Sequence, residues 1–384
     1  MLGFRPGRLI TALASSVLVL AFFAGCGGGG GSSSGGGSGS SEPSGGTSPQ
    51  QAKVQAEVAE LTKRPTSIGI TVPVKGGPPP GKTIAYLQCG LPDCVSIGDS
   101  VRAAAGLVGW KVDTVETGLT PQTIQAGWNE ALRREPDAII QSGSPEASIY
   151  KEQLDEALAK KIPILGIVEN TQGPPFLLST GSFPGYVKGM VQDDAKYIAS
   201  KISSGKVYVI EFPGISIVKK QTEAFKEELA KDCPACETEE MAIPPTSIGT
   251  DAPAKIADFI RGHPGGKFLY SPSPDLVVGL AAALSGAGIE EMPTVMVNLN
   301  EGSHELLQEG AGGLQATVTL PSVEGPYRMI DALARYWRGQ SVAPDRDDTL
   351  PRWIVEAGKV PDEQPLPQVK DYKAQFEKLW GLSN

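Results

Sequence analysis

The sequence predicts an α/β protein of two lobes, each a doubly wound parallel β-sheet with helices on both faces. Short apolar runs typical of buried strands alternate with helical stretches of about 10–17 residues between residues 83 and 338. The alternation restarts near residue 186, after a first block of four expected strands. About 330 residues follow the low-complexity N-terminal segment, which is more than one typical domain holds.

The first block begins with Thr83–Leu87, an apolar run containing β-branched residues, which we expect to be a buried strand. Ile124, Trp128 and Leu132 recur at fourfold spacing, which places them on one face of a helix. The expected strands are 83–87, 111–116, 138–141 and 163–167, and the expected helices are 97–108, 120–135 and 145–160.

The second block repeats this rhythm with longer helices. The expected strands are 206–210, 238–243, 267–270, 294–298 and 314–318, and the expected helices are 186–202, 215–231, 250–261, 274–287 and 322–338. Residues 51–61 favour a helix ahead of a Pro/Gly-rich stretch. The tail 368–382 predicts an amphipathic helix that packs back on the body through Val369, Tyr372, Phe376, Leu379 and Trp380.

The first 25 residues have the pattern of an export signal. Arg5 and Arg8 precede an uncharged stretch, residues 9–23, and small residues then lead to Cys26. The cysteine resembles that of a bacterial lipobox, although Phe23 replaces the usual leucine, and the alternative is an ordinary secretory signal with a chance cysteine. Residues 26–50 are almost entirely Gly, Ser, Pro and Thr, so we expect a flexible tether carrying a lipid anchor at Cys26.

The other cysteines form two closely spaced pairs, Cys89 with Cys94 and Cys233 with Cys236. In an exported protein such pairs are usually bridged. The second pair could instead be a redox or metal motif. It follows an expected helix, however, whereas a redox pair opens one, and two histidines are too few for a convincing zinc site. We therefore expect two structural disulfides.

No pattern in the sequence predicts catalysis. A G-x-x-x-x-G-K-[ST] match at residues 76–83 lies in the Pro/Gly-rich stretch and leads into an expected strand, whereas a phosphate-binding loop follows a strand and opens a helix. No G-x-S-x-G elbow follows an expected strand, since the match at residues 31–35 lies in the low-complexity segment. His263 and His304 lie at expected helix ends, without a nucleophile nearby, and we expect both at the surface. Adjacent acid pairs such as 193–194 and 239–240 are expected to be solvated. A net charge of −9 argues against nucleic acid as a partner. We expect a protein that is not an enzyme and holds neither cofactor nor metal.

Several segments resemble the ribose/galactose-type periplasmic binding proteins, over residues 82–340. The matching stretches are 83–87, the loop with Pro92, 95–97, 206–210 with Phe225, 258–268 and 316–321. The resemblance implies a type I periplasmic binding protein. Its two lobes would be joined by three hinge strands, expected near 180–186, 319–322 and 345–353, and would close around a small-molecule ligand delivered to an ABC permease.

The resemblance also sets the expected organisation. Lobe 1 would comprise residues 82–183 and 320–348, and lobe 2 residues 184–319 and 349–360, with a strap at 51–81 and a helical tail at 361–384. We expect a monomer, lipid-anchored at the extracytoplasmic face of the bacterial cell membrane. The alternative role is a sensor that presents its closed state to a membrane signalling partner.

Carried over position by position, the family's ligand contacts mostly change type here. The aromatic pair falls at Asp93 and Cys94, an Asp-Arg pair at Val168 and Glu169, and further contacts at Gln221, Ser273, Pro274, Asn300 and Thr319. Independently of the resemblance, Gln141, Ser142, Ser144 and Asn170 are polar residues at expected strand ends, where ligands of such sheets bind. Because few charges remain, we expect a largely neutral pocket for a sugar-like or related molecule other than a simple pentose.

Overall fold

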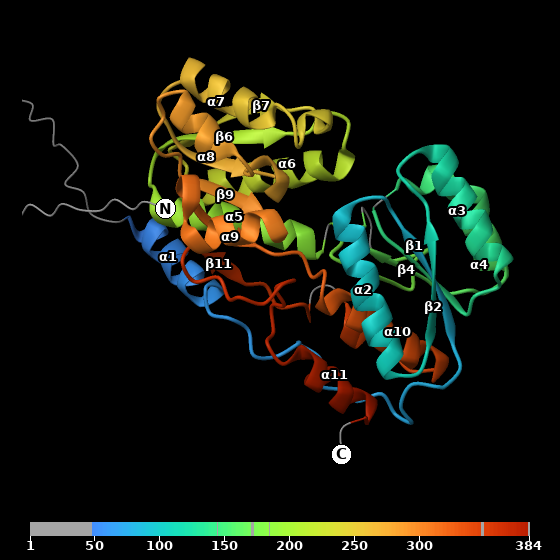
Figure 1. Ribbon diagram of the computed structural model, residues 1–384. Coiled ribbons are helices and arrows are strands. Elements are labelled where there is room, and N and C mark those ends of the chain that lie inside the picture. The colour runs from blue at the N-terminus through green and yellow to red at the C-terminus, as the bar shows by residue number, and fades with distance from the viewer. Residues whose placement is uncertain (1–47, 144, 170–172, 184, 347–348, 383–384) are drawn as a thin grey trace, which may run out of the picture. The chain divides into compact units, whose positions relative to one another are not determined.

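Two β-sheets, one of five strands and one of six, organise the chain into two lobes (Figure 1). The computed structural model describes residues 48–143, 145–169, 173–183, 185–346 and 349–382, which belong to one compact unit, Thr47–Asn384. The first sheet has the order β2-β1-β3-β4-β5 and is parallel throughout. The second has the order β11-β10-β9-β8-β6-β7 and is parallel except for β11. The predicted fold class is confirmed.

The first sheet and its helices form lobe 1. Its elements are β1 (Thr83–Gln88), α2 (Pro92–Leu107), β2 (Lys111–Glu116), α3 (Pro121–Arg133), β3 (Ala138–Gln141), η1 (Ala147–Tyr150), α4 (Lys151–Ala159), β4 (Ile164–Ile167), β5 (Leu178–Thr180) and, from much later in the chain, α10 (Glu324–Trp337). The strand order reverses between β1 and β3, so the carboxyl ends of these strands flank a crevice suited to ligands.

The second sheet and its helices form lobe 2. Its elements are α5 (Tyr186–Lys201), β6 (Gly205–Glu211), α6 (Ser216–Asp232), β7 (Cys236–Ala242), η2 (Pro245–Ser247), α7 (Ala252–Gly262), β8 (Gly266–Ser271), η3 (Pro274–Leu276), α8 (Leu280–Gly286), β9 (Thr294–Val297), α9 (Glu301–Glu309), η4 (Ala311–Gly313), β10 (Leu314–Val318) and β11 (Ile354–Glu356).

Some expected elements differ from those observed. The single helix expected over 274–287 is wrong: η3 and α8 are separated at Gly279, whose φ of 80° is left-handed and does not continue a helix. The stretch 145–160 likewise divides into η1 and α4. Strands β5 and β11 were not expected, because three residues are too few for a periodic pattern.

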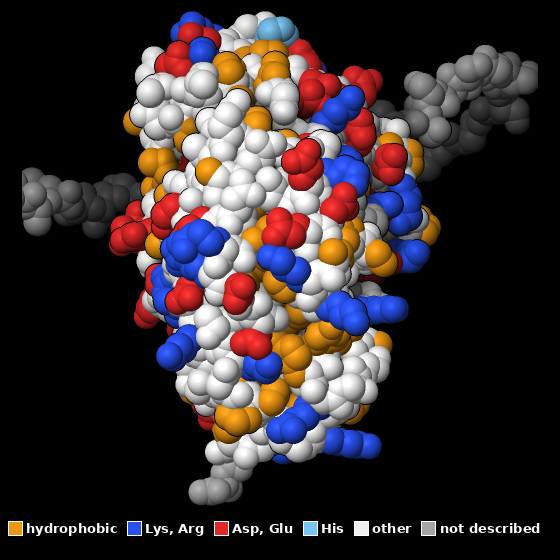
Figure 2. All heavy atoms as spheres, turned by 90° about the vertical axis from the view of Figure 1, so that its right-hand side faces the viewer, with side chains coloured by type: hydrophobic (Ala, Val, Ile, Leu, Met, Phe, Trp, Pro, Cys, Tyr) orange, Lys and Arg blue, Asp and Glu red, His pale blue; other side chains and the backbone are white. Residues whose placement is uncertain are grey.

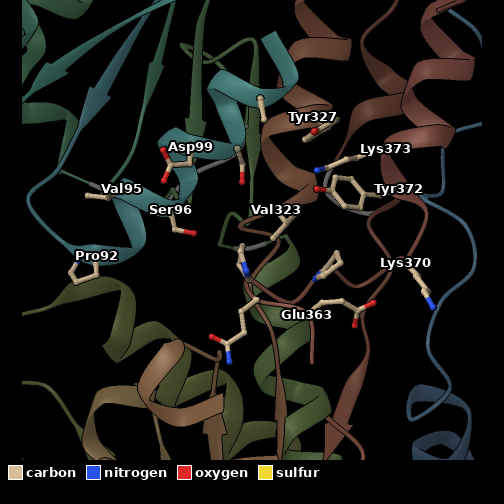
Figure 3. Close-up of a pocket in the computed structure, with 15 residues that line it drawn as sticks. Pro92, Val95, Ser96, Asp99, Val323, Tyr327, Glu363, Lys370, Tyr372 and Lys373 are labelled. Atoms are coloured by element: carbon tan, nitrogen blue, oxygen red, sulfur yellow. The ribbon is translucent and has the colours of Figure 1, made fainter. Parts of the chain in front are cut away.

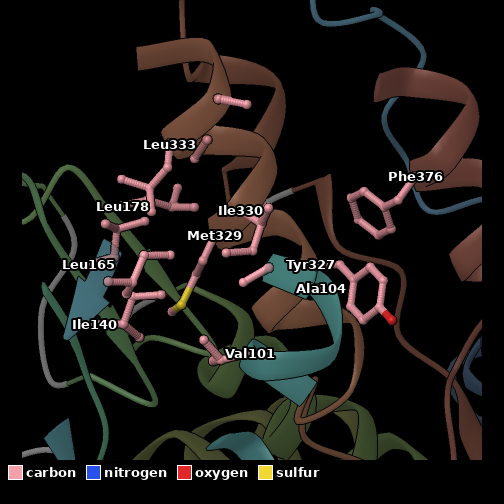
Figure 4. Close-up of a cluster of buried hydrophobic side chains, with 14 of the residues drawn as sticks. Val101, Ala104, Ile140, Leu165, Leu178, Tyr327, Met329, Ile330, Leu333 and Phe376 are labelled. Atoms are coloured by element: carbon pink, nitrogen blue, oxygen red, sulfur yellow. The ribbon is translucent and has the colours of Figure 1, made fainter. Parts of the chain in front are cut away.

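The core of lobe 1 combines residues from distant parts of the chain (Figure 4). Met329, Ile330 and Leu333 of α10 pack with Ile140 and Leu165 of the sheet, and all five are fully buried. Each such side chain contributes about 1.5–3 kcal/mol by leaving water. Helix α10 is therefore an integral part of lobe 1, although the whole of lobe 2 up to β10 precedes it.

Both ends of the body run from one lobe to the other. Helix α1 (Pro49–Leu61) packs on lobe 2 through Val54 and Val58, whereas residues 68–74 enter the core of lobe 1. At the other end, residues 361–371, here called the C-terminal strap, lead from β11 to α11 (Tyr372–Trp380) on lobe 1. The predicted packing of the tail helix is confirmed. Among the described helices, none has the length and apolar character needed to cross a bilayer.

Candidate functional site

A cavity of about 420 Å³ is lined by residues of both lobes, of the connections between them and of the C-terminal strap. Its walls come from the start of α2, the loop after β9, the start of α9 and the segment after β10. The polar residues among them are Asp93, Ser96, Asn298, Asn300, Glu301, His304, Thr319, Ser322 and Gln364. The cavity follows the carboxyl ends of β1, β9 and β10, where sheets of this kind bind ligands.

Lobe 1 contributes Asp93, which lies in the first turn of α2. The disulfide Cys89–Cys94 joins the segment after β1 to this turn, with a Cα–Cα distance of 5.6 Å, and so limits how Asp93 can move. Burial, together with the charge of Asp275, raises the pKa of the Asp93 carboxyl. The Nδ2 of Asn298, from lobe 2, lies 3.5 Å from the Oδ2 of Asp93, and this long contact links the two lobes across the cavity.

Lobe 2 contributes two asparagines at the end of β9. Asn298 has a φ of 68°, a left-handed conformation that asparagine tolerates better than most residues, and its Oδ1 accepts the backbone N–H of Leu320 at 3.1 Å. Asn300 caps α9 by accepting the N–H of Ser303, and its Nδ2 donates to Asp275 at 2.6 Å. Both amides are thus held by the backbone and by neighbours.

His304 corrects the expectation of a surface histidine, because it is 3% exposed and lines the cavity. Its Nδ1 lies 3.0 Å from the Nε2 of Gln364 in the C-terminal strap. The path of the strap brings these two residues together, and the sequence around Gln364 carries no local signal that predicts their contact. The expectation for His263 is confirmed, since it caps the exposed end of α7.

Two buried polar atoms of the cavity wall have no hydrogen-bonding partner within the described residues: Nε2 of His304 and Oγ1 of Thr319. The backbone carbonyl of Thr319, by contrast, is well held. It accepts the hydroxyl of Tyr186 at 2.8 Å and Nε2 of Gln368 at 3.1 Å. The strap also donates the N–H of Val369 to Glu324 at 2.9 Å, and burial raises the pKa of that glutamate to about 7.

Of the residues predicted to bind ligand, Asp93, Asn300 and Thr319 line this cavity. The described ones that do not line it are Gln141, Ser142, Glu169, Gln221 and Ser273. Gln141 is turned into lobe 1, where it accepts from Trp128 and donates to Tyr150 and Glu169 at 2.8, 2.9 and 3.0 Å. Ser142 donates to the carbonyl of Leu87 at 3.0 Å.

The other predicted contacts lie farther along the chain. Gln221 is buried in α6, and Ser273 caps η3 through the N–H of Asp275. Ser144, Asn170 and the expected lipidation site Cys26 fall outside the described residues.

Glu169 occupies a strained and buried corner at the end of β4. The residue before it, Val168, has a φ of 55°, which is unusual for a β-branched residue. A Cβ at Gly166 would overlap the side chain of Glu169, so this close approach requires glycine there. Burial is the main cause that raises the pKa of Glu169 to about 8, and the hydrogen bond from Gln141 opposes the rise.

A second cavity of about 900 Å³ adjoins the first (Figure 3). It runs between α2, α10 and the strap, and Figure 3 shows Asp99 and Ser96 on one side and Glu363, Lys370 and Lys373 on the other. Pro92, Ser96, Val323, Gln364 and Pro365 line both cavities.

Other predictions about charged residues and cysteines have mixed outcomes. Both expected disulfides are present, and Cys233–Cys236 joins the end of α6 to the start of β7. Asp193 and Asp194 are not solvated as expected: both are buried, and Asp193 pairs with Arg352 at 2.5 Å. Within the described residues, acidic, histidine and cysteine side chains form no cluster that could hold a metal ion.

No family model and no curated protein matches this chain. Solved structures do match. A sugar-binding protein of a sugar ABC transporter from Bacillus halodurans has a TM-score of 0.60 at 18% identity, covering 73% of this chain and 99% of that one. A periplasmic ribose ABC transporter protein from Conexibacter woesei has a TM-score of 0.58 at 20% identity. The match covers 75% of this chain and 90% of that one. The fold is that of the type I periplasmic binding proteins.

The binding-protein fold also occurs in a matched chain of the XylFII–LytSN complex, with a TM-score of 0.61 at 16% identity, covering 73% of this chain and all of that one. At these identities the likeness concerns the fold. Because the matched chains are covered almost from end to end, this chain contains the binding-protein fold in full.

Proposed function

We propose that this chain is an extracytoplasmic solute-binding lipoprotein that captures a small, neutral, sugar-like molecule and delivers it to an ABC importer. The observation that carries the proposal is the cavity of about 420 Å³ lined by both lobes of a binding-protein fold. The neighbours of this fold are named as binding components of sugar transporters, which favours a transport role without catalysis.

The chemistry of the cavity favours a neutral ligand with several hydroxyl groups. Amide, hydroxyl and imidazole groups dominate its polar lining, and they both donate and accept hydrogen bonds. The charged groups of the lining, Asp93 and Glu301, and the exposed Asp275 beside it are acidic and would repel an anion. On the face in Figure 2, basic and acidic side chains are interspersed, with no single-sign patch of the kind that binds nucleic acid.

The proposed mechanism is closure of the two lobes on the ligand. Bending would occur in the connections at 180–186, 319–322 and 345–353, between lobes bounded as 82–183 with 320–348 and 184–319 with 349–360. A ligand touching both lobes shifts the protein toward the closed form by its preference for that form. The monomeric closed form would engage the permease, and a lipid on Cys26 would keep it at the membrane.

The test is a thermal-shift screen of residues 47–384 against pentoses, hexoses, polyols, nucleosides and amino acids, followed by calorimetry. Saturation at about 1,000 times the dissociation constant should raise the free energy of unfolding by about 4 kcal/mol. Asp93→Asn should weaken binding of the best compound, whereas Asp99→Asn, on the exposed face of the same helix, should not. If both variants bind like the wild type, the ligand does not use this cavity.

A second candidate is a sensor that presents its closed form to a membrane signalling partner. The match to a chain of the XylFII–LytSN complex favours it, because a chain with this fold also occurs in a complex with another component. A gene for a permease and an ATPase beside this one would support the importer, and a gene for a membrane kinase would support the sensor.

A further inference from the structure

The C-terminal strap forms one wall of the proposed ligand cavity, with Gln364, Pro365 and Leu366 lining it. The segment is held on both sides of Gln364. Asp362 accepts from Gln308 of α9 at 2.8 Å, Leu366 is buried in the core of lobe 2, and Gln368 donates to the carbonyl of Thr319 at 3.1 Å. The position of Gln364 is therefore set by the fold and needs no ligand to order it.

The bond between Gln364 and His304 determines where the imidazole proton lies. The amide Nε2 of Gln364 can only donate, so Nδ1 of His304 must accept, at 3.0 Å. A neutral imidazole that accepts at Nδ1 carries its proton on Nε2. This Nε2–H is buried and has no partner within the part of the chain that the structure describes. A buried donor without an acceptor keeps the cost of leaving water uncompensated, so an oxygen that reaches it is strongly favoured.

Thr319 presents a second such atom on the wall of the same cavity. Its Oγ1 is buried and also lacks a partner among the described residues, and Thr319 itself is 3% exposed. A hydroxyl group of a ligand can accept from an imidazole N–H, and another can exchange a hydrogen bond with a threonine hydroxyl. An anion could also accept from Nε2–H, but it would meet the acidic residues Asp93 and Glu301 of the same lining.

We propose that Gln364 is a positioning residue that fixes the Nε2–H tautomer of His304, and that His304 Nε2 and Thr319 Oγ1 together bind two hydroxyl groups of a neutral polyhydroxylated ligand. This inference rests on the proposed function and assigns part of the ligand site to the C-terminal strap. His304 contacts the ligand, and Gln364 acts through His304.

The test uses nitrogen-15 NMR of untagged protein, residues 47–384, which form a compact unit. The chain has only two histidines, so the spectrum resolves His304 against His263 as an internal reference. In the free protein, His304 should carry its proton on Nε2. Addition of D-glucose, D-galactose, D-mannose or D-fructose, whichever raises the melting temperature, should shift the Nε2 resonance of His304 and leave His263 unchanged.

Gln364→Glu separates positioning from mere structural support, because it keeps the shape of the side chain and removes the donor. A carboxylate can only accept, so the variant should place a proton on Nδ1 of His304. At a pH at which the imidazole stays neutral, this reverses the tautomer and the ligand hydroxyl must turn to donate to Nε2, so binding should weaken by up to about tenfold, the effect of losing one hydrogen bond. His304→Ala should weaken binding to a similar or greater extent. Glu363→Gln breaks the strap's 3.3 Å ion pair with Arg64 outside this cavity and should change neither the tautomer nor the affinity.

The outcomes separate this inference from the proposed function. A proton on Nδ1 of His304 in the free wild-type protein overturns the role of Gln364. A sugar that raises the melting temperature but leaves Nε2 unshifted, with His304→Ala binding normally, overturns this inference alone. If none of the four sugars nor any compound of the wider screen binds, the proposed function fails and the ligand contact fails with it.

Discussion

Replacing the buried Glu169 with glutamine should remove much of the pH dependence of stability near neutral pH. Burial raises the pKa of this carboxyl from 4.5 to about 8 in the folded protein. Between these values the folded state keeps a proton that the unfolded state releases. Stability is therefore highest below the unfolded pKa and is lost as the pH rises toward the folded one.

The size of the effect follows from the two pKa values. One pKa unit corresponds to about 1.4 kcal/mol, and raising the pH from about 5 to about 8 crosses most of the interval between them. The wild type should accordingly lose about 3 kcal/mol of unfolding free energy through Glu169 over that range. Glu169→Gln mimics the protonated acid and can still accept a hydrogen bond from Gln141. Its unfolding free energy should therefore fall correspondingly less over the same pH range.

Urea unfolding at both pH values measures the difference. Glu324, whose folded pKa is raised to about 7, titrates in the same direction, but it is present in both proteins and cancels in the comparison. Glu152→Gln removes an exposed carboxylate on α4 and serves as the control, with a slope like that of the wild type. Equal pH slopes for wild type and Glu169→Gln would refute the argument that Glu169 is neutral in the folded protein.

Three further variants test the packing of the body. Trp380→Ala removes a fully buried side chain and its 2.7 Å hydrogen bond to Asp331, and should cost about 3–5 kcal/mol in urea unfolding. Arg352→Met leaves the buried Asp193 without its partner and should cost about 3 kcal/mol at neutral pH, with part recovered in acid as the carboxyl protonates. Cys89→Ser opens a short disulfide loop and should lower stability by about 2 kcal/mol, measured against wild type under non-reducing conditions.

The fold was largely predictable because strands and helices of parallel sheets carry local signals. The apolar run at Thr83 and the fourfold spacing in α3 depend on neighbours within a few residues. The break at Gly279 and the three-residue β5 carry weaker signals, since one glycine or three residues do not establish a period.

The candidate site was only partly predictable. Asp93, Asn300 and Thr319 were located through the resemblance to a known family and line the cavity. Gln141 and Ser142, chosen because polar residues at strand ends often bind ligands, instead make hydrogen bonds inside lobe 1. His304 was misjudged because its burial depends on Gln364, sixty residues later, and the sequence does not show that the strap returns to α9. Asp193 was misjudged for the same reason, since its partner Arg352 follows more than one hundred and fifty residues later.

The chain crosses between the lobes at both ends of the body as well as in the three connections between the sheets. The core of lobe 1 consequently contains residues from Ile68 to Trp380, with lobe 2 inserted in between. Neither lobe can be cut out as one continuous piece, so neither should persist after the other unfolds. Proteases that attack unfolded chains would therefore have to wait for the whole body to open.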